Sequence, residues 1–169
     1  MASDYERQDA LYSQAIAEFG DALSRLARAY ESDSDRRSDL LQDIHLEIWR
    51  SFAGFQQQCS LRTWVYRVAH NVGISKRLRP RKVHLVSLQE IAEISAGTEE
   101  SAVEEAHDLA RLLELVRQLV PPDNQVMLLY LEDMDAASIG EITGLSSRAV
   151  AMRIHRIKAI LARQLRISP

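Results

Sequence analysis

The sequence predicts an all-α protein of two small helical domains joined by a linker, with a helix-turn-helix in the second domain. Apolar residues recur at helical spacing through most of the chain, which is typical of helices that bury one face. Six glycines and four prolines among 169 residues leave little room for loops. A polar stretch over residues 81–107 lacks this periodicity. Loops beyond about 15 residues are uncommon inside one compact domain, so this stretch is expected to be a linker.

Composition excludes several classes of protein. The longest apolar run, Val126 to Leu131, is far too short to cross a bilayer. The acidic N-terminus is unlike a signal peptide, and one cysteine excludes an internal disulfide framework and suits a reducing cytoplasm. The sequence lacks a glycine-rich phosphate loop and metal-site spacings of His or Cys, so we expect no catalytic activity, cofactor or metal. A redox role for Cys59, in a loop, is the weaker alternative.

Charge is segregated along the chain, although the net charge is only −3. Residues 48–89 hold eight bases and no acid, residues 87–110 hold seven acids and no base, and residues 142–169 hold six bases and no acid. Salt screens charges that are farther apart than the Debye length, about 8 Å in physiological salt, so the local charge of each block matters more than the net charge. Two basic blocks that flank an acidic one therefore favour a nucleic-acid partner.

The first block predicts three helices after a loose acidic leader at residues 1–14. They are expected at 16–30, 36–52 and 61–79, with Ser34 or Asp35 as the cap of the second and a loop at 52–59. The third helix should bury Val65, Val68 and Val72. Its outward face should carry a basic, aromatic and amide set that suits phosphate contacts and stacking on unpaired bases. On this face lie Arg62, Tyr66, His70 and Arg77, with Arg67 and Asn71 alongside and Arg79, Arg81 and Lys82 at the end of the helix. A solvated basic helix is an equally open interpretation.

The second block predicts helices at 106–119, 123–132, 136–143 and 148–166, of which the last two form the helix-turn-helix. Asp135 caps the first of this pair, Gly144 makes the turn, and Ser146 or Ser147 caps the second. Gly140 lets the two helices approach closely. In the last helix Val150, Ile154, Ile157 and Leu161 form one buried stripe, and the opposite face is basic. Such a helix fits a major groove; an ordinary amphipathic helix is the alternative.

Several motifs resemble regions 2 and 4 of bacterial RNA polymerase sigma factors of the extracytoplasmic-function (ECF) class. The segments Asp39–Asp43 and Leu61–Asn71 resemble region 2, with Leu46, Trp49 and Phe52 between them. The segment Leu119–Leu165, with Pro121-Pro122 and Gly144, resembles region 4. The resemblance covers residues 16–80 and 108–166.

The resemblance implies a transcription initiation factor that binds core RNA polymerase and recognises the −10 and −35 elements of promoter DNA. An anti-sigma factor is a further partner of such proteins. The implied domains are a leader at 1–14, region 2 at 15–80, an acidic linker at 81–107 that would thread through polymerase channels, and region 4 at 108–169. The polymerase-binding residues would be Asp39, Gln42, Asp43, Leu46 and Trp49. The −10 contacts would be Arg62, Tyr66, Arg67, His70, Asn71, Lys76 and Arg77, beside a base-capturing loop at 52–60. The −35 contacts would be Ser147, Arg148, Met152, Arg153, His155 and Arg156.

The recognition helix departs from the family pattern, because Ala149, Ala151 and Met152 stand where polar residues are common. Apolar side chains cannot make bidentate base contacts, so the −35 element would be unusual or read through phosphates and shape. Gly73 and Ser75 also stand where better helix formers are usual. Two rival functions remain open: a stand-alone dimeric helix-turn-helix regulator, and an interaction module that has lost DNA binding.

Overall fold

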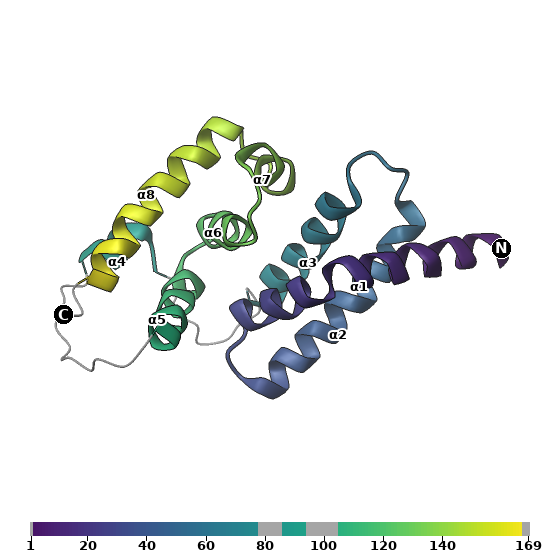
Figure 1. The fold of residues 1–169 in the computed structure, drawn as a ribbon, viewed down its shortest axis with the longest axis horizontal. Coiled ribbons are helices and arrows are strands. Elements are labelled where there is room, and N and C mark those ends of the chain that lie inside the picture. The colour runs from purple at the N-terminus through teal and green to yellow at the C-terminus, as the bar shows by residue number, and fades with distance from the viewer. Residues whose placement is uncertain (1, 78–85, 94–104, 167–169) are drawn as a thin grey trace. The chain divides into compact units, whose positions relative to one another are not determined.

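The computed structural model describes residues 2–77, 86–93 and 105–166 (Figure 1). These residues are almost entirely helical, which confirms the all-α class; the β-type pairing recorded among them is one isolated parallel bridge between Val86 and Leu119. The chain divides into two compact units, residues 1–81 and 82–169. No helix of the described ranges is long and apolar enough to cross a membrane.

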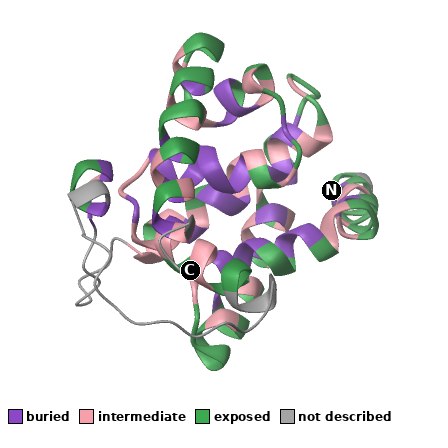
Figure 2. Cartoon of the chain, turned by 60° about the vertical axis from the view of Figure 1, so that its left-hand side comes forward, coloured by how far each residue is buried: buried purple, intermediate pink, exposed green. Residues whose placement is uncertain are grey.

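Unit 1 is a packed set of three helices, α1 (Ala2–Tyr30), α2 (Ser34–Ser51) and α3 (Leu61–Arg77), each of which contacts the other two. A short 3-10 helix, η1 (Phe52–Gly54), follows α2. The inward faces are buried and the outward faces exposed (Figure 2). The centre of this core is formed by Leu23, Leu26, Ile44, Ile48, Val65 and Ala69.

The helix α1 begins at Ala2, so the expectation of a loose leader at residues 1–14 is wrong. Residues 2–19 contain neither glycine nor proline, so nothing in them interrupts a helix. Gln8 is buried and donates from Nε2 to the Trp49 carbonyl at 2.6 Å, and Tyr12 Oη bonds His45 Nδ1 at 2.8 Å. Contacts with α2 therefore order turns whose polar composition suggested disorder.

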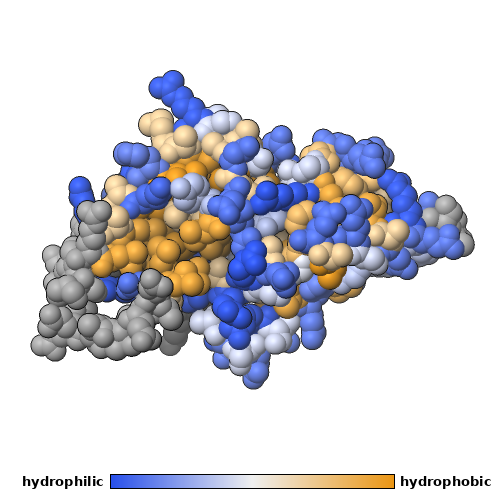
Figure 3. Space-filling view, in the orientation of Figure 1, coloured by the Kyte–Doolittle hydropathy of each residue, from blue (hydrophilic) through white to orange (hydrophobic). Residues whose placement is uncertain are grey.

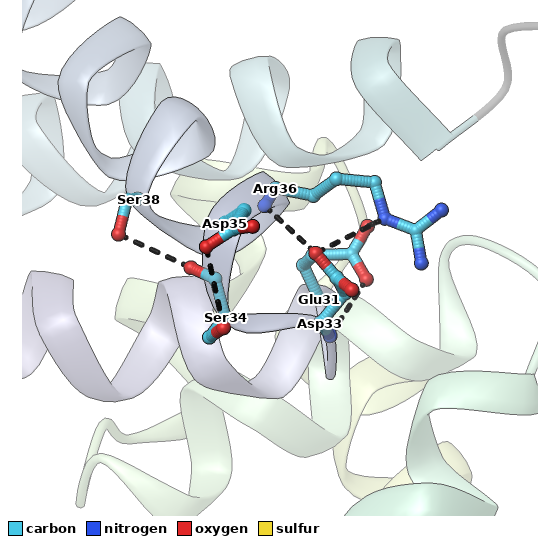
Figure 4. A network of polar contacts seen from close by, with 6 residues as sticks. All are labelled: Glu31, Asp33, Ser34, Asp35, Arg36 and Ser38. Carbon is cyan, nitrogen blue, oxygen red and sulfur yellow. Dashed lines mark hydrogen bonds and ion pairs between the residues drawn. The ribbon is translucent and has the colours of Figure 1, made fainter.

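The turn from α1 to α2 is capped by Asp33, not by the expected Ser34 or Asp35 (Figure 4). Asp33 Oδ1 accepts from the Arg36 backbone N–H at 3.0 Å, and this bond holds the pKa of the exposed carboxyl below its usual value. The Asp33 N–H in turn donates to Glu31 Oε1 at 3.1 Å. Any of three neighbouring residues with short oxygen acceptors could cap here, so the residue chosen depends on where the chain leaves α1.

Unit 2 contains α4 (Leu88–Glu93), α5 (Glu105–Gln118), α6 (Asp123–Leu131), α7 (Ala136–Thr143) and α8 (Ser147–Arg166). Most of the linker expected at 81–107 lies outside the described residues. Within its described part, α4 packs on α8: Ile91 is fully buried, and its carbonyl accepts from Gln164 Nε2 at 2.8 Å. Part of the predicted linker is therefore a structural helix of unit 2.

Candidate nucleic-acid interfaces

The helix-turn-helix of unit 2 has the predicted cap and turn. Asp135 Oδ1 accepts from the Ser138 N–H at 2.8 Å and begins α7. Gly144 ends α7 in the left-handed region, at φ 77°, and its N–H donates to the Gly140 carbonyl at 2.9 Å. A Cβ added to Gly140 would lie 2.6 Å from the Leu145 carbonyl oxygen. Only glycine therefore permits this approach of the turn to α7.

The exposed face of α8 presents most of the residues expected to meet the −35 element. Ser146 Oγ accepts from the Ala149 N–H at 3.2 Å and caps the helix, so the residues just after it begin a well-formed first turn. Val150, Ile157 and Leu161 are buried on the inner face. The outer face exposes Ser147, Arg148, Met152, His155 and Arg156. Met152, at 65% exposure, is an apolar side chain in the middle of this surface.

Arg153 differs from the rest of that set, because it is half-buried and its guanidinium pairs with a carboxylate of unit 2. Its Nη1 lies 2.5 Å from Asp123 Oδ1, and the Asp123 side chain is only 8% exposed at the start of α6. A buried carboxylate needs a charged partner, since burial without one is costly. Arg153, which the sequence places on the flank of the basic face, therefore also ties α8 to α6.

In unit 1 the outward face of α3 carries fewer of the expected DNA-binding residues than the sequence predicts. Asn71 is exposed, and Arg62 and Arg67 are half-buried. The Arg62 guanidinium lies 5.6 Å from the centroid of the Tyr66 ring. Lys76 forms an ion pair with Asp43 of α2. A residue expected to bind DNA is therefore paired with a residue expected to bind polymerase.

Tyr66, His70 and Arg77 were expected to point outward, and for these three the expectation is wrong. Tyr66 and His70 are 2% and 1% exposed, and the guanidinium nitrogens of Arg77 are buried. The buried stripe of α3 includes Tyr66, His70 and Gly73, whereas Val68 and Val72 are only half-buried. The helix is thus rotated relative to the prediction, which placed its polar and aromatic residues outside on polarity alone.

A buried hydrogen bond explains why His70 lies inside. Tyr30 Oη bonds His70 Nδ1 at 2.8 Å. Burial lowers the pKa of His70 to about 3 and raises the pKa of Tyr30. His70 Nε2 finds no hydrogen-bond partner among the described residues, so His70 is a neutral core residue. The Tyr30 ring covers Gly73, where a Cβ would lie 2.7 Å from the ring, which accounts for the glycine in α3.

The expected polymerase-binding residues share one face of α2. Asp39 and Gln42 are exposed, and Leu46 is 44% exposed. Trp49 is half-buried: its indole Nε1 donates to Asp9 Oδ1 at 2.8 Å, and the Tyr5 ring stacks on it at 6.4 Å between centroids. The covering residues of α1 are functional candidates that sequence patterns did not single out. Uninterrupted helical composition before residue 15 is the signal that would have found them.

Apolar side chains also gather on the surface of unit 2 (Figure 3). Residues of α6, α7 and α8 line a groove of about 600 Å³ there, including Tyr130, Met134, Ile154 and Ala159. Lys158 Nζ borders the groove and lies 5.1 Å from the centroid of the Tyr130 ring. Among the described residues, no group of His, Cys, Asp and Glu is placed to hold a metal ion.

Comparison with known proteins gives the same division of the chain. Residues 15–82 match the family described as Sigma-70 region 2, and residues 109–161 match Sigma-70, region 4. The chain is 26% identical to the ECF RNA polymerase sigma factor SigW of Bacillus subtilis, over 94% of this chain and 90% of SigW. It is 25% identical to the RNA polymerase sigma factor CnrH of Cupriavidus metallidurans, over 89% of this chain and 84% of CnrH.

Two solved structures share the fold. CnrH in complex with the cytosolic domain of CnrY matches with a TM-score of 0.71 at 21% identity, over 99% of this chain and 96% of that chain. The sigma factor RpoE in complex with the anti-sigma factor NepR, from Bartonella quintana, matches with a TM-score of 0.67 at 20% identity, over 94% and 98%. With both family regions matched in order and relatives aligned over nearly their whole length, this chain belongs to the sigma-70 family as an ECF-class RNA polymerase sigma factor, a protein that directs transcription initiation at promoters.

Proposed function

We propose that the two units divide promoter recognition, with α8 of unit 2 at the −35 element and α3 of unit 1 at the −10 element. The observation that carries this proposal is that the division of the chain into two structural units agrees with its division into the two family regions. The region 2 and region 4 matches fall on separate structural units. In unit 2, α8 exposes Arg148 and Arg156, and in unit 1, α3 carries the half-buried Arg62 and Arg67 beside the exposed Asn71.

At the −35 element, α8 enters the major groove with its N-terminal turns nearest the bases. Arg148 and Arg156 are exposed and suit phosphate or guanine contacts, and His155 lies between them in sequence. Met152 offers apolar contact, which suits a thymine methyl group. Arg153 contributes indirectly, because its bond to Asp123 fixes α8 on α6.

At the −10 element, α3 and the loop at 52–60 receive the non-template strand as it becomes single-stranded. Arg62 and Arg67 supply charge for phosphates, and Asn71 supplies an amide that can bond a base edge. Taking a base out of the stack costs a few kcal/mol, which contacts in the loop must offset. Tyr66, His70 and Arg77 support this surface from inside unit 1.

Core polymerase docks on the exposed face of α2, at Asp39, Gln42 and Leu46, with Asp43 and Trp49 at its edges. An exposed leucine among acids and amides suits a partner surface that is basic with an apolar centre. Two relatives of the same fold have been solved with partner proteins, CnrY and NepR. An anti-sigma factor is accordingly a proposed partner of this chain, which works in the cytoplasm with the polymerase and has no catalytic role itself.

Reconstituted transcription tests this proposal. The purified chain is mixed with core polymerase, and promoters are selected from a pool of random duplexes by run-off transcription. The proposal expects a stable complex with core enzyme and enriched sequences with two conserved blocks. Operator binding by the chain alone, without a complex with core enzyme, would instead indicate a stand-alone regulator. A complex with core enzyme that transcribes nothing from the pool would indicate an interaction module without promoter recognition.

A further inference from the structure

The first turns of α1 are bonded to the end of α2 and to the loop that follows it. Gln8 Nε2 donates to the Trp49 carbonyl at 2.6 Å, and the Trp49 indole N–H donates to Asp9 Oδ1 at 2.8 Å. The preceding residue contacts the loop, because Arg7 Nη2 donates to the Phe55 carbonyl at 3.0 Å. These α1 residues lie outside the region 2 match, which begins at residue 15, and none of them is among the expected polymerase or DNA contacts.

Phe55 is the inner anchor of the loop between α2 and α3. It is 3% exposed, and its ring centroid lies 5.9 Å from that of Phe52 and 5.2 Å from that of Trp64. Its backbone N–H donates to the Phe52 carbonyl at 3.2 Å, and its own carbonyl is the acceptor for Arg7. Both the side chain and the backbone of Phe55 are therefore fixed where the exposed part of the loop begins.

Three consecutive glutamines follow this anchor, and all three are exposed. Gln57 adopts φ 59°, which is uncommon for a residue with a Cβ, and Gln58 Oε1 accepts from the Gln56 N–H at 2.7 Å. A residue persists in such a conformation only where its surroundings determine it. Glutamine amides offer donors and acceptors together, which is the chemistry that reads the edge of an unpaired base.

We propose that Arg7 is a positioning residue for this loop: by holding the Phe55 carbonyl, it sets the start of the glutamine segment in the geometry that receives an unpaired base. The proposal rests on the proposed role of the loop at the −10 element. Arg7 acts through Phe55 and does not touch DNA. Its removal should therefore weaken the base-dependent part of single-strand binding and leave the phosphate-dependent part unchanged.

Binding to single strands that lack one base at a time separates the base-dependent part of the affinity from the phosphate-dependent part. Holoenzyme is assembled from the full chain and core polymerase, and the promoter comes from the selection described above. The probe is a labelled oligonucleotide with its non-template −10 strand. Derivatives of the probe carry one abasic site at each position in turn. The variants are Arg7→Ala, Arg7→Lys and, as a neighbouring exposed control, Glu6→Ala.

For wild-type holoenzyme we expect one or two positions at which loss of the base lowers affinity. Arg7→Ala should bind the intact oligonucleotide about fivefold to tenfold more weakly, the equivalent of one lost hydrogen bond, and its abasic penalties at those positions should shrink. The salt dependence of binding should not change. Arg7→Lys should recover part of the affinity, because an ammonium group can donate to the same carbonyl. Glu6→Ala should match the wild type.

Three outcomes would overturn the inference, and they are distinguishable. Wild-type abasic penalties that persist in Arg7→Ala would disprove the role of Arg7 and leave the role of the loop intact. A loss of DNA affinity matched by equal losses of core-polymerase binding and thermal stability would make Arg7 a general structural residue. If wild-type holoenzyme shows no base dependence at any position, the proposed role of the loop is itself wrong.

Discussion

Replacing Gly140 by alanine tests the close approach that builds the helix-turn-helix. Alanine in a helix interior is favoured over glycine by about 1 kcal/mol, so propensity alone would stabilise α7. The new Cβ would, however, lie 2.6 Å from the Leu145 carbonyl oxygen, a backbone atom that cannot rotate away. Overpacking typically costs about 1–3 kcal/mol, and contact with backbone belongs at the upper end. We expect a net loss of about 2 kcal/mol, or a fall of about 10 °C in the midpoint of unit 2.

The assay uses the location of the tryptophans. The chain has two, Trp49 and Trp64, and both lie in unit 1, so their fluorescence reports unit 1 while far-ultraviolet circular dichroism reports both units. Gly140→Ala should lower the midpoint seen by circular dichroism and leave the tryptophan midpoint unchanged. The matched control is Gly20→Ala in α1, where the added Cβ meets only Ile16 Cγ2, at 3.5 Å. This control should raise the tryptophan midpoint. An unchanged or raised circular dichroism midpoint in Gly140→Ala would refute the close approach.

Further substitutions separate structural charges from binding charges. Arg153→Ala should destabilise unit 2 by about 1–3 kcal/mol in urea, since the buried Asp123 carboxylate loses its partner; equal stability would place Arg153 on the free face. Arg156→Ala should leave stability within about 0.5 kcal/mol and reduce the salt slope of −35 binding by about one unit, and an unchanged slope would remove Arg156 from the interface. Asp43→Ala should weaken core-polymerase binding in an equilibrium titration with the fold intact; normal assembly would exclude this residue from the docking face. In the folded protein His70 stays neutral, with a pKa of about 3, whereas in the unfolded chain it has its ordinary pKa of about 6.5. Between these two pH values the unfolded state therefore binds one proton more than the folded state. Stability should therefore fall as pH drops from about 6.5 towards 3, by up to about 1.4 kcal/mol per pH unit, and His70→Gln should reduce this slope in urea titrations monitored by fluorescence. Identical slopes would show that His70 is not buried and neutral.

Sequence patterns predicted the helices from residue 105 onward well, because local chemistry determines where each of them begins and ends, but they did not assign α4 to unit 2. The helix expected at 136–143 has those bounds, since Asp135 and Gly144 are strong start and stop signals that need no tertiary contact. The pattern also identified Gly140 as the point of close approach. It missed the ion pair of Arg153, because Asp123 is 30 residues away and no periodicity links the two.

Unit 1 was harder to predict because long-range contacts override local polarity there. Tyr66 and His70 suggested a solvent-facing strip, but α1 supplies Tyr30 as a hydrogen-bond partner for His70 and a ring that packs on Gly73. The same helix orders its own first turns through contacts with Trp49 and Phe55, 41 and 48 residues away. Hydrophobic spacing within one helix cannot reveal a buried polar pair whose members lie on different helices.

Site-specific photocrosslinking in the promoter complex tests the central claim most directly. A photoreactive residue is placed at Asn71 of α3 or at Arg156 of α8, both exposed, and holoenzyme is assembled on a selected promoter. The division of recognition between the units predicts that position 71 crosslinks to the non-template strand of the −10 element, and position 156 to the −35 duplex. Crosslinks from both positions to one element, or from position 71 to duplex DNA alone, would contradict it.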